Sequence, residues 1–262
     1  MDEKIWFDAC NVQVKYQRRF FFNNLTLKFR LGESTALLGP NGAGKSSITK
    51  LINRELYPIV KPNSHLKLFG NAHVNIWQLR KRIGILNTEL EARFLPTTTS
   101  QEIVLSAFFG AMRLGRDQRP TDQQQKTVEK LLNSLHLETI KEKSFGELSD
   151  GERRRLMLAR AIVHQPEVLI LDEPTRALDL KACHQLLSHL RALCQKGTTL
   201  LLITHRIETI LPEINRILFL KKGKIVGDGQ ADTMLSDQPL SDLFETPLSV
   251  VHQQGFHQVL PK

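Results

Sequence analysis

The sequence predicts an α/β fold with a mainly parallel sheet, an N-terminal antiparallel β lobe and an inserted α-helical lobe. A glycine-rich loop at residues 39–46 lies between an apolar run and a segment that can be helical. Two further apolar runs, at 168–171 and 199–203, have the composition of buried strands and lead into polar residues. Between the loop and these runs, residues 102–112 and 126–135 show helical apolar spacing. Together these patterns predict a parallel sheet with a helical insertion.

The beginning of the chain favours strands. Residues 5–16 alternate loosely, and residues 25–31 alternate cleanly between apolar and polar side chains. Gly32 and Glu33 then form a turn into the apolar run 35–38. We therefore expect a small antiparallel lobe ahead of the glycine-rich loop.

The loop itself fits the pattern G-x-x-x-x-G-K-[ST] of a phosphate-binding loop. Its residues are Gly39, Pro40, Asn41, Gly42, Ala43, Gly44, Lys45 and Ser46, and Ser47 follows. Glycines let the backbone curl around a polyphosphate with its N–H groups pointing inward. We expect Lys45 to reach the outer phosphates and Ser46 to hold Mg²⁺, while the next helix, expected at 47–53, points its positive end at the anion. An ordinary turn is the alternative, but the flanking strand and helix favour nucleotide binding.

An aromatic ring in the N-terminal lobe could stack on the adenine of that nucleotide. Tyr16 is the candidate, and the aromatic residues from Phe20 to Phe22 are rivals. A tyrosine packed inside the lobe explains the pattern almost as well.

The middle of the chain predicts the inserted lobe. Residues 66–69 and 83–86 favour strands, whereas 102–112 and 126–135 favour helices joined by a polar linker. We expect one domain over 1–262, with a helical subdomain at approximately 90–165 and a short C-terminal extension at 230–262. The loop tips of the helical lobe suit a docking partner, although a solvent-exposed linker is the simpler interpretation.

A capping box marks the start of another helix. Ser149 and Glu152 form S-x-x-E, with Asp150 and Gly151 between them, ahead of an apolar stripe in 153–164. The amides at this helix end could bind an anion, although most capping boxes are purely structural.

Two adjacent carboxylates follow the apolar run 168–171. Beside a phosphate loop their roles are separable, with Asp172 near Mg²⁺ and Glu173 polarising the attacking water. Capping of the next turn is the alternative. The run 199–203 leads to His205, which reaches the same sheet edge, near a terminal phosphate, if the strands are parallel neighbours. Elsewhere a lone histidine after a strand is more often structural.

The C-terminal tail is expected to form two hairpins, and its residues indicate no catalytic or binding site. One joins 217–220 to 224–226 around Lys222 and Gly223, and the other spans 249–259 around Gln254 and Gly255.

Composition sets broader limits. The 262 residues are 41% hydrophobic, carry a net charge of +9 and include three cysteines without metal-site spacing. No apolar run is long enough to cross a bilayer, and the polar start is no signal peptide, so we expect a cytoplasmic protein. The positive charge favours phosphate-rich surfaces only weakly, because the basic clusters, among them 153–155, are small and most simply interpreted as solvated.

In their order, these residues resemble the ATP-binding cassette (ABC) ATPases from about Ile5 to Gly229. The resemblance rests on Tyr16, the phosphate loop, the signature-like segment 148–152, Asp172 with Glu173, the segment 177–179, and His205. It implies a P-loop NTPase core and a head-to-tail homodimer, in which the signature of one chain closes over ATP and Mg²⁺ held by the other. It also gives Asp179 a role in communication across that interface.

Two positions depart from the family pattern. A glutamine is usual where this chain has Thr88, so a residue that contacts the metal or positions water is missing, and Asn87 or Thr88 would have to substitute through oxygen. Asp150 stands where glycine is commonest, and its carboxylate suits a helix N-terminus but would repel a phosphate unless it points away.

The resemblance implies the ATPase subunit of a membrane transporter, a translocase on the cytoplasmic face of the membrane whose separate membrane-spanning permease chains grip the helical lobe. Thr88 with the signature segment is similar to metal-chelate importers. A soluble ABC ATPase that acts on ribosomes, nucleic acid or a protein assembly is a second hypothesis, and a low-turnover nucleotide-gated scaffold is a third. We expect no direct nucleic-acid partner.

Overall fold

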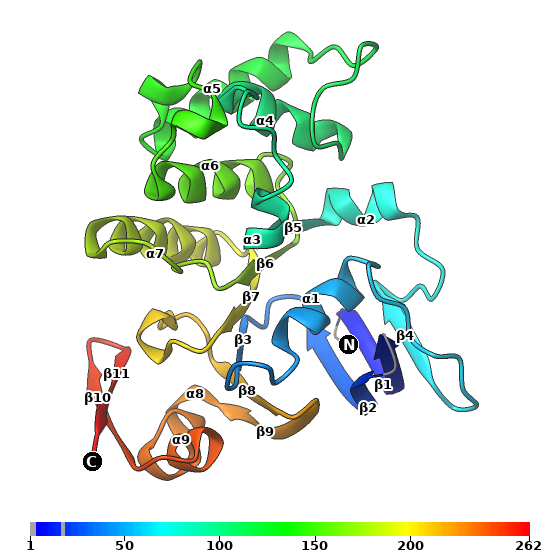
Figure 1. Ribbon diagram of the computed structural model, residues 1–262, viewed down its shortest axis with the longest axis vertical. Coiled ribbons are helices and arrows are strands. Elements are labelled where there is room, and N and C mark those ends of the chain that lie inside the picture. The colour runs from blue at the N-terminus through cyan, green and yellow to red at the C-terminus, as the bar shows by residue number, and fades with distance from the viewer. Residues whose placement is uncertain (1–3, 17–18) are drawn as a thin grey trace. The chain divides into compact units, whose positions relative to one another are not determined.

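The computed structural model describes residues 4–16 and 19–262, apart from the side chains of Tyr16, Arg19 and Phe20, and confirms the predicted α/β fold class (Figure 1). The chain forms two compact units, Met1–Ile76 with Thr199–Lys262 and Trp77–Thr198. No helix in the described ranges is both long and apolar enough to cross a bilayer. The subdomain boundaries at 90, 165 and 230 stay predictions.

The first unit contains most of the strands. Its elements are β1 (Ile5–Tyr16), β2 (Arg19–Arg30), β3 (Thr35–Leu38), α1 (Lys45–Ile52), β4 (His65–Leu68), β7 (Thr199–Thr204), the 3-10 helix η4 (Ile207–Thr209), β8 (Arg216–Lys221), β9 (Lys224–Gln230), α8 (Ala231–Met234), α9 (Asp237–Phe244), β10 (Leu248–Gln253) and β11 (Phe256–Pro261).

The predicted N-terminal lobe is the antiparallel sheet β2-β1-β4. Three aromatic residues of its paired strands β1 and β2, Trp6, Phe7 and Phe29, are buried, and a register shift between Ile5 and Phe7 interrupts the regular alternation there. The rings of Trp6 and Phe29 stack with centroids 5.4 Å apart. Burial of such large side chains is the main stabilisation of so small a sheet.

A parallel sheet lies at the centre of the first unit. Strand β3 pairs in parallel with both β7 and β8, and β9 adds an antiparallel edge to β8. All four residues of β3 and all six of β7 are buried, as expected of strands covered on both faces. This register brings the carboxyl ends of β3 and β7 to one edge.

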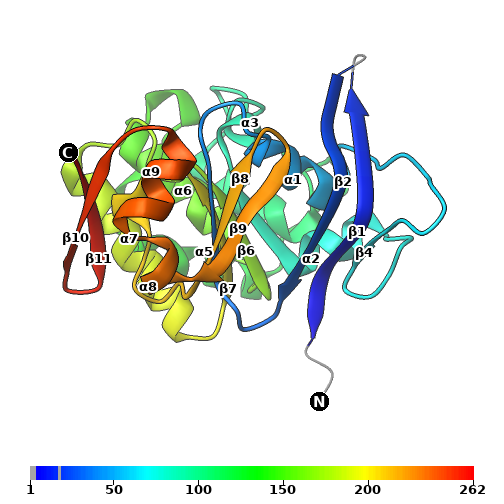
Figure 2. The same ribbon diagram turned by 90° about the horizontal axis from the view of Figure 1, so that it is seen from below.

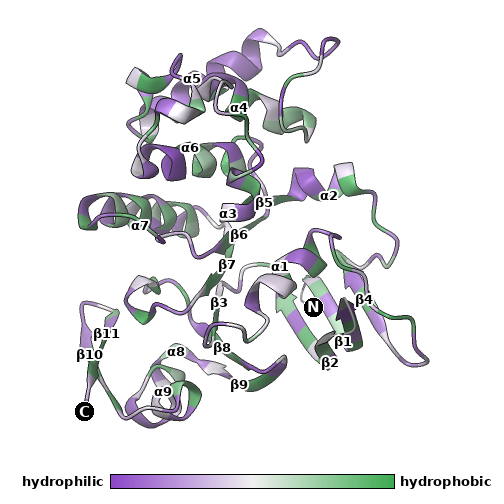
Figure 3. Ribbon diagram, in the orientation of Figure 1, coloured by the Kyte–Doolittle hydropathy of each residue, from purple (hydrophilic) through white to green (hydrophobic). Residues whose placement is uncertain are grey.

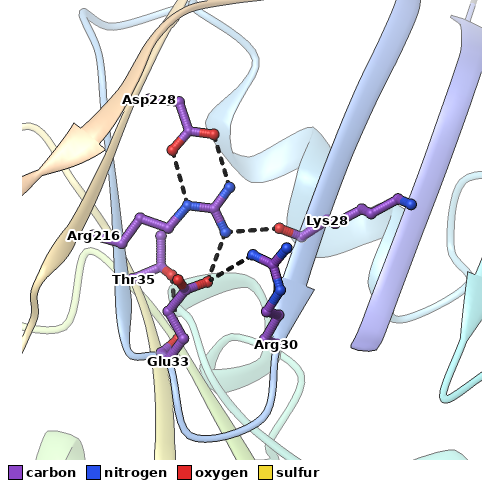
Figure 4. Close-up of polar contacts among 6 residues, drawn as sticks. All are labelled: Lys28, Arg30, Glu33, Thr35, Arg216 and Asp228. Carbon is purple, nitrogen blue, oxygen red and sulfur yellow. Dashed lines mark hydrogen bonds and ion pairs between the residues drawn. The ribbon is translucent and has the colours of Figure 1, made fainter. Parts of the chain in front are cut away.

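One arginine ties the N-terminal lobe to this sheet (Figure 4). Arg216 of β8 donates two hydrogen bonds to Asp228 of β9, at 2.9 and 2.8 Å. It donates two more, to the backbone oxygen of Lys28 in β2 and to Glu33. The hydrogen bonds and charges of Asp228 and Glu33 raise the pKa of Arg216, so its guanidinium stays positively charged. Its hydrogen bonds fix β2, β8 and β9 to one another.

Both predicted hairpins are present. Lys222 with Gly223, and Gln254 with Gly255, have positive φ, which two-residue turns between twisted antiparallel strands require. The second hairpin, β10 with β11, lies beside α9 (Figure 2) and also packs on η4. The C-terminal extension therefore contacts the turn that follows β7.

The second unit holds most of the helices. Its elements are α2 (Ile76–Arg82, whose first residue belongs to the first unit), β5 (Ile83–Leu86), α3 (Thr88–Glu91), α4 (Ser100–Ser106), α5 (Asp122–Ser134), α6 (Asp150–Ile162), β6 (Val168–Asp172), α7 (Leu180–Gln195) and the 3-10 helices η1 (Ala107–Phe109), η2 (Glu138–Ile140) and η3 (Phe145–Glu147).

Strands β5 and β6 are parallel, and helix α6 covers β5. The approach is so close that a Cβ added at Gly84 would lie 2.2 Å from the backbone oxygen of Ala161. Helices α4, α5 and α6 contact one another and form the predicted helical lobe.

The sequence misjudged several helix bounds. Helix α4 ends at Ser106 and continues only as η1, because Gly110 turns the backbone to φ 62°. Helix α5 begins four residues before the predicted position, at Asp122, because Thr121 and Gln124 form a capping box. Helix α7, capped by Asp179, was not predicted, and neither were α2, α3, α8 and α9.

Candidate functional site

The phosphate-binding loop leaves the buried strand β3 and ends where α1 begins, as predicted. The left-handed Gly44, at φ 107°, is the N-cap of α1, and among the described residues no side chain caps this helix end. The helix N-terminus and its positive partial charge are therefore directed at the loop. Ser46 is exposed, whereas Ser47 is buried and its N–H donates to the backbone oxygen of Gly44.

Gly39 shows why the loop needs glycine at its first position. A Cβ there would lie 2.1 Å from the backbone oxygen of Leu220 in β8, so any other residue would push the loop away from the sheet. The loop is also pinned from the neighbouring hairpin, because the N–H of Gly223 donates to the oxygen of Ala43 at 2.9 Å. The loop is thus held in shape by the strands around it.

Lys45 is folded back over the loop. Its side chain is 8% exposed, and Nζ donates to the backbone oxygens of Gly39 at 2.7 Å and Pro40 at 3.2 Å. A buried ammonium held by carbonyl oxygens is a concentrated positive charge, positioned where a polyphosphate would meet the loop.

His205 lies at the same sheet edge as the loop. Leu38 pairs with Thr204 in the parallel register, so Gly39 and His205 are the next residues on neighbouring strands. The turn after His205 is fixed by Thr204, whose hydroxyl accepts from the N–H of Arg206 at 3.0 Å, and by Thr209, whose hydroxyl donates to the oxygen of Arg206 at 2.7 Å. The sequence did not identify these threonines as positioning residues.

The two predicted carboxylates follow β6 in the second unit. Asp172 is only 8% exposed, and Glu173 is half-buried. Glu173 has φ 50°, in the left-handed region that few residues other than glycine adopt. Such backbone strain costs on the order of 1–3 kcal/mol and is commonest at functional positions.

Asn87 and Thr88, the two predicted substitutes for the missing glutamine, differ in their hydrogen bonding. The Oδ1 of Asn87 accepts a hydrogen bond from the N–H of Leu90 at 2.7 Å and caps α3. The next residue, Thr88, is exposed at the start of that short helix. Of the two predicted substitutes, Thr88 therefore has the more available side-chain oxygen.

The predicted capping box at α6 is confirmed. The Ser149 hydroxyl accepts from the N–H of Glu152, and the Glu152 carboxylate accepts from both the N–H and the hydroxyl of Ser149. The backbone hydrogen bond from Ser149 is the main cause that lowers the pKa of Glu152. Asp150 is exposed, and its carboxylate lies 3.8 Å from the guanidinium of Arg153, which partly offsets its charge.

Asp179 is placed beside this helix end. Its Oδ1 accepts from the N–H of Ala182 at 2.7 Å and caps α7. A Cβ added at Gly151 would lie only 3.1 Å from the Cβ of Ala182. The helical turn that Asp179 caps is thus packed against the signature segment, and the communication role that the resemblance implies for Asp179 stays a prediction. Tyr16 is the last residue of β1, and its side chain lies outside the described residues.

The interpretation of Arg153–Arg155 as a solvated cluster was wrong for Arg154. Arg154 is 5% exposed, and its guanidinium lies 3.2 Å from the carboxylate of Glu91 at the end of α3. Burial lowers the pKa of Arg154 and the charge of Glu91 opposes that shift. Helical spacing could have shown this, because Arg154 shares the apolar face of α6 with Leu158 and Ala161.

Glu91→Ala should therefore lower the free energy of unfolding by about 3 kcal/mol, because a buried guanidinium loses its partner. The unfolding midpoint in urea, followed by circular dichroism, measures this. Glu129→Ala is the matched control, since the ion pair of Glu129 with Lys141 is on the surface of the same unit and should matter little. Equal shifts of the midpoint in both variants would contradict the prediction.

A hollow of about 260 Å³ opens between α3 and the helical lobe. It is lined by Thr88, Glu91, Ala92, Phe94, Pro96, Phe145, Gly146 and Arg153. Arg153 lies over the ring of Phe145 and donates to the backbone oxygens of Phe145 and Gly146. The hollow therefore has an apolar floor and a cationic rim.

Comparison with known proteins agrees with these features. Residues 22–176 match the family model described as ABC transporter. An uncharacterized ABC transporter ATP-binding protein of Lactococcus lactis is 30% identical, over 96% of each chain. The cobalt import ATP-binding protein of Rhodobacter capsulatus is 32% identical over 82% of this chain and 75% of its own length. A solved structure described as an inward-facing metal-chelate type ABC transporter has a chain that superposes with a TM-score of 0.78 at 25% identity, over 99% of this chain and 98% of that chain.

Proposed function

The chain belongs to the ABC transporter family, as an ATP-binding subunit with ATPase activity, and we propose that it is the translocase subunit that converts ATP hydrolysis into transport across a membrane. The observation that carries the proposal is the phosphate loop with the buried Lys45 at its centre. No other charged group of the loop is placed to meet the outer phosphates of ATP.

The ligand in this proposal is a magnesium nucleotide. Ser46 and Asp172 would hold Mg²⁺, since hydroxyl and carboxylate oxygens are ligands that this ion prefers, with Thr88 as a further oxygen. When bound, the ion neutralises charge that develops on the phosphates. The loop residues 39–47 bind the triphosphate, Glu173 takes a proton from the attacking water, and His205 contacts the terminal phosphate.

A second copy of the chain completes the site in this proposal. The capping box leaves the amides at the start of α6 beside Ser149 and Gly151, and an anion from another chain can meet them there. ATP then links two copies of the chain, and Asp179 takes part in communication across their interface. Hydrolysis breaks the link because ADP stabilises the closed dimer less than ATP does.

The membrane partner is proposed to dock in the hollow beside α3. Its apolar floor of Phe94, Pro96 and Phe145 suits an apolar segment, and Arg153 at its rim suits an acidic residue or a helix C-terminus. In this proposal the subunit lies on the cytoplasmic face of a membrane, bound to permease chains. The likeness to a metal-chelate type transporter and to a cobalt import protein supports a metal or metal-chelate substrate.

Copurification tests this function. When the tagged chain is purified from gently solubilised membranes, a protein with membrane-spanning helices should copurify with it at a constant molar ratio. Phe145→Ser should reduce this recovery by roughly ten-fold, the scale for losing one apolar anchor, while leaving ATP binding unchanged. Recovery of ribosomes or nucleic acid with no hydrophobic partner would replace the proposal with the soluble ATPase hypothesis.

A further inference from the structure

Helix α2 presents an unusual pairing of an exposed tryptophan and exposed cations. Trp77 is 55% exposed, and the last turn of the helix is basic, with Arg80 and Lys81 both exposed. The guanidinium of Arg80 lies 5.6 Å from the centre of the Trp77 ring. Exposed tryptophans are uncommon on surfaces that face only water.

The segment after η1 lies against this tryptophan. Arg80 donates to the backbone oxygen of Gly110 at 3.0 Å, and a Cβ added at Gly110 would lie 3.0 Å from the Trp77 ring. The segment is held to the helical lobe by two further hydrogen bonds, from Arg160 to the oxygen of Ala111 and from the N–H of Leu114 to Glu102. Its position beside α2 is therefore built by specific contacts.

This segment continues the positive charge of α2. Between residues 111 and 120 it carries three exposed arginines, Arg113, Arg116 and Arg119, against one acidic residue, Asp117. Most of the segment between η1 and α5 is hydrophilic (Figure 3). Its arginines therefore project from a part of the chain that offers few apolar contacts.

We propose that these residues form a binding surface for the anionic lipid headgroups of a bilayer. The surface, called the basic patch below, consists of Trp77, Arg80, Lys81, Arg113, Arg116 and Arg119. Each cation close to an anionic bilayer strengthens binding about five-fold, and tryptophan prefers the level of the headgroups. The proposal rests on the proposed function, because only a subunit held at a membrane regularly meets the headgroups of a bilayer.

The geometry favours a bilayer over nucleic acid. Single-stranded nucleic acid binds by stacking bases on open aromatic faces. Trp77 is the single aromatic residue of the basic patch, and Arg80 covers one face of its ring. A bilayer needs only diffuse charge and an aromatic ring at the interface, both of which the patch supplies.

Cosedimentation of the full chain with vesicles tests the proposal. The chain should bind vesicles that contain roughly a third phosphatidylglycerol and should bind phosphatidylcholine vesicles weakly. Arg113→Gln with Arg116→Gln should weaken binding by roughly 25-fold, from two factors of about five. Lys126→Gln with Lys130→Gln is the matched control, because it removes the same charge from α5 of the same unit, and it should weaken binding by less than about three-fold.

Three results would overturn the proposal: no binding by the original chain, equal losses in the two double variants, or a patch variant that loses binding to a single-stranded oligonucleotide while it keeps vesicle binding. ATP hydrolysis and permease copurification are measured on the same samples. If ATP hydrolysis and permease copurification persist while vesicle binding is absent, the proposal of lipid binding by the basic patch is wrong and the transporter function stands. Trp77→Ala provides an independent variant, and it should release the chain from anionic vesicles while it keeps all four arginines of the basic patch.

Discussion

Glu173→Gln should leave ATP binding intact and lower ATP turnover by roughly 10²-fold or more, the scale for losing a general base. Glutamine keeps the size of glutamate and accepts hydrogen bonds, but it cannot take a proton from water. Steady-state release of phosphate measures turnover, and titration with ATP measures binding. The variant should also persist as an ATP-linked dimer on gel filtration, because the link is no longer hydrolysed.

A matched control separates chemistry from folding. Glu138→Gln changes the same group in η2 of the same unit and should keep normal turnover. Normal turnover in Glu173→Gln would show that Glu173 is not the base. Failure of Glu173→Gln to bind ATP would instead show that this residue acts in binding.

The structure gives a reason why this position is sensitive. Glu173 has its left-handed φ of 50° directly after a strand whose five residues are all buried. The backbone is further held by the hydrogen bond from the N–H of Arg176 to the oxygen of Glu173. The backbone that carries this carboxylate is thus strained and hydrogen-bonded at the end of a buried strand, as is common at functional positions.

Local patterns predicted the elements that carry the phosphate loop to within two residues. Strand β3 has the predicted bounds because Thr35 and three consecutive apolar residues lie between a polar residue and glycine, and α1 starts at the motif lysine. The capping box at Ser149 was equally readable, since its two hydrogen bonds join residues three apart. Such features depend on neighbours in sequence.

Features that depend on tertiary contacts were missed. The ion-pair partner of Arg154 is Glu91, and the need for glycine at position 39 arises from Leu220, each far from its contact in sequence. Helix α7 is a different case, because Leu186, Leu187 and Leu190 recur with helical spacing, and the helix was missed although this local pattern predicts it. The sequence also did not predict that Asn87 caps a helix, because α3 itself was not predicted.

Lys45→Ala should abolish measurable ATP binding, because the loop loses the only ammonium folded onto its described backbone. In the structure Nζ lies 2.7 Å from the oxygen of Gly39, so the charge is already in place before the nucleotide arrives. Titration calorimetry with ATP and Mg²⁺ measures the loss. Lys50→Ala, on the same helix but only half-buried, is the control and should keep its affinity. Unchanged affinity in a folded Lys45→Ala protein would remove the phosphate-loop assignment, and with it the reason for placing ATP at this sheet edge.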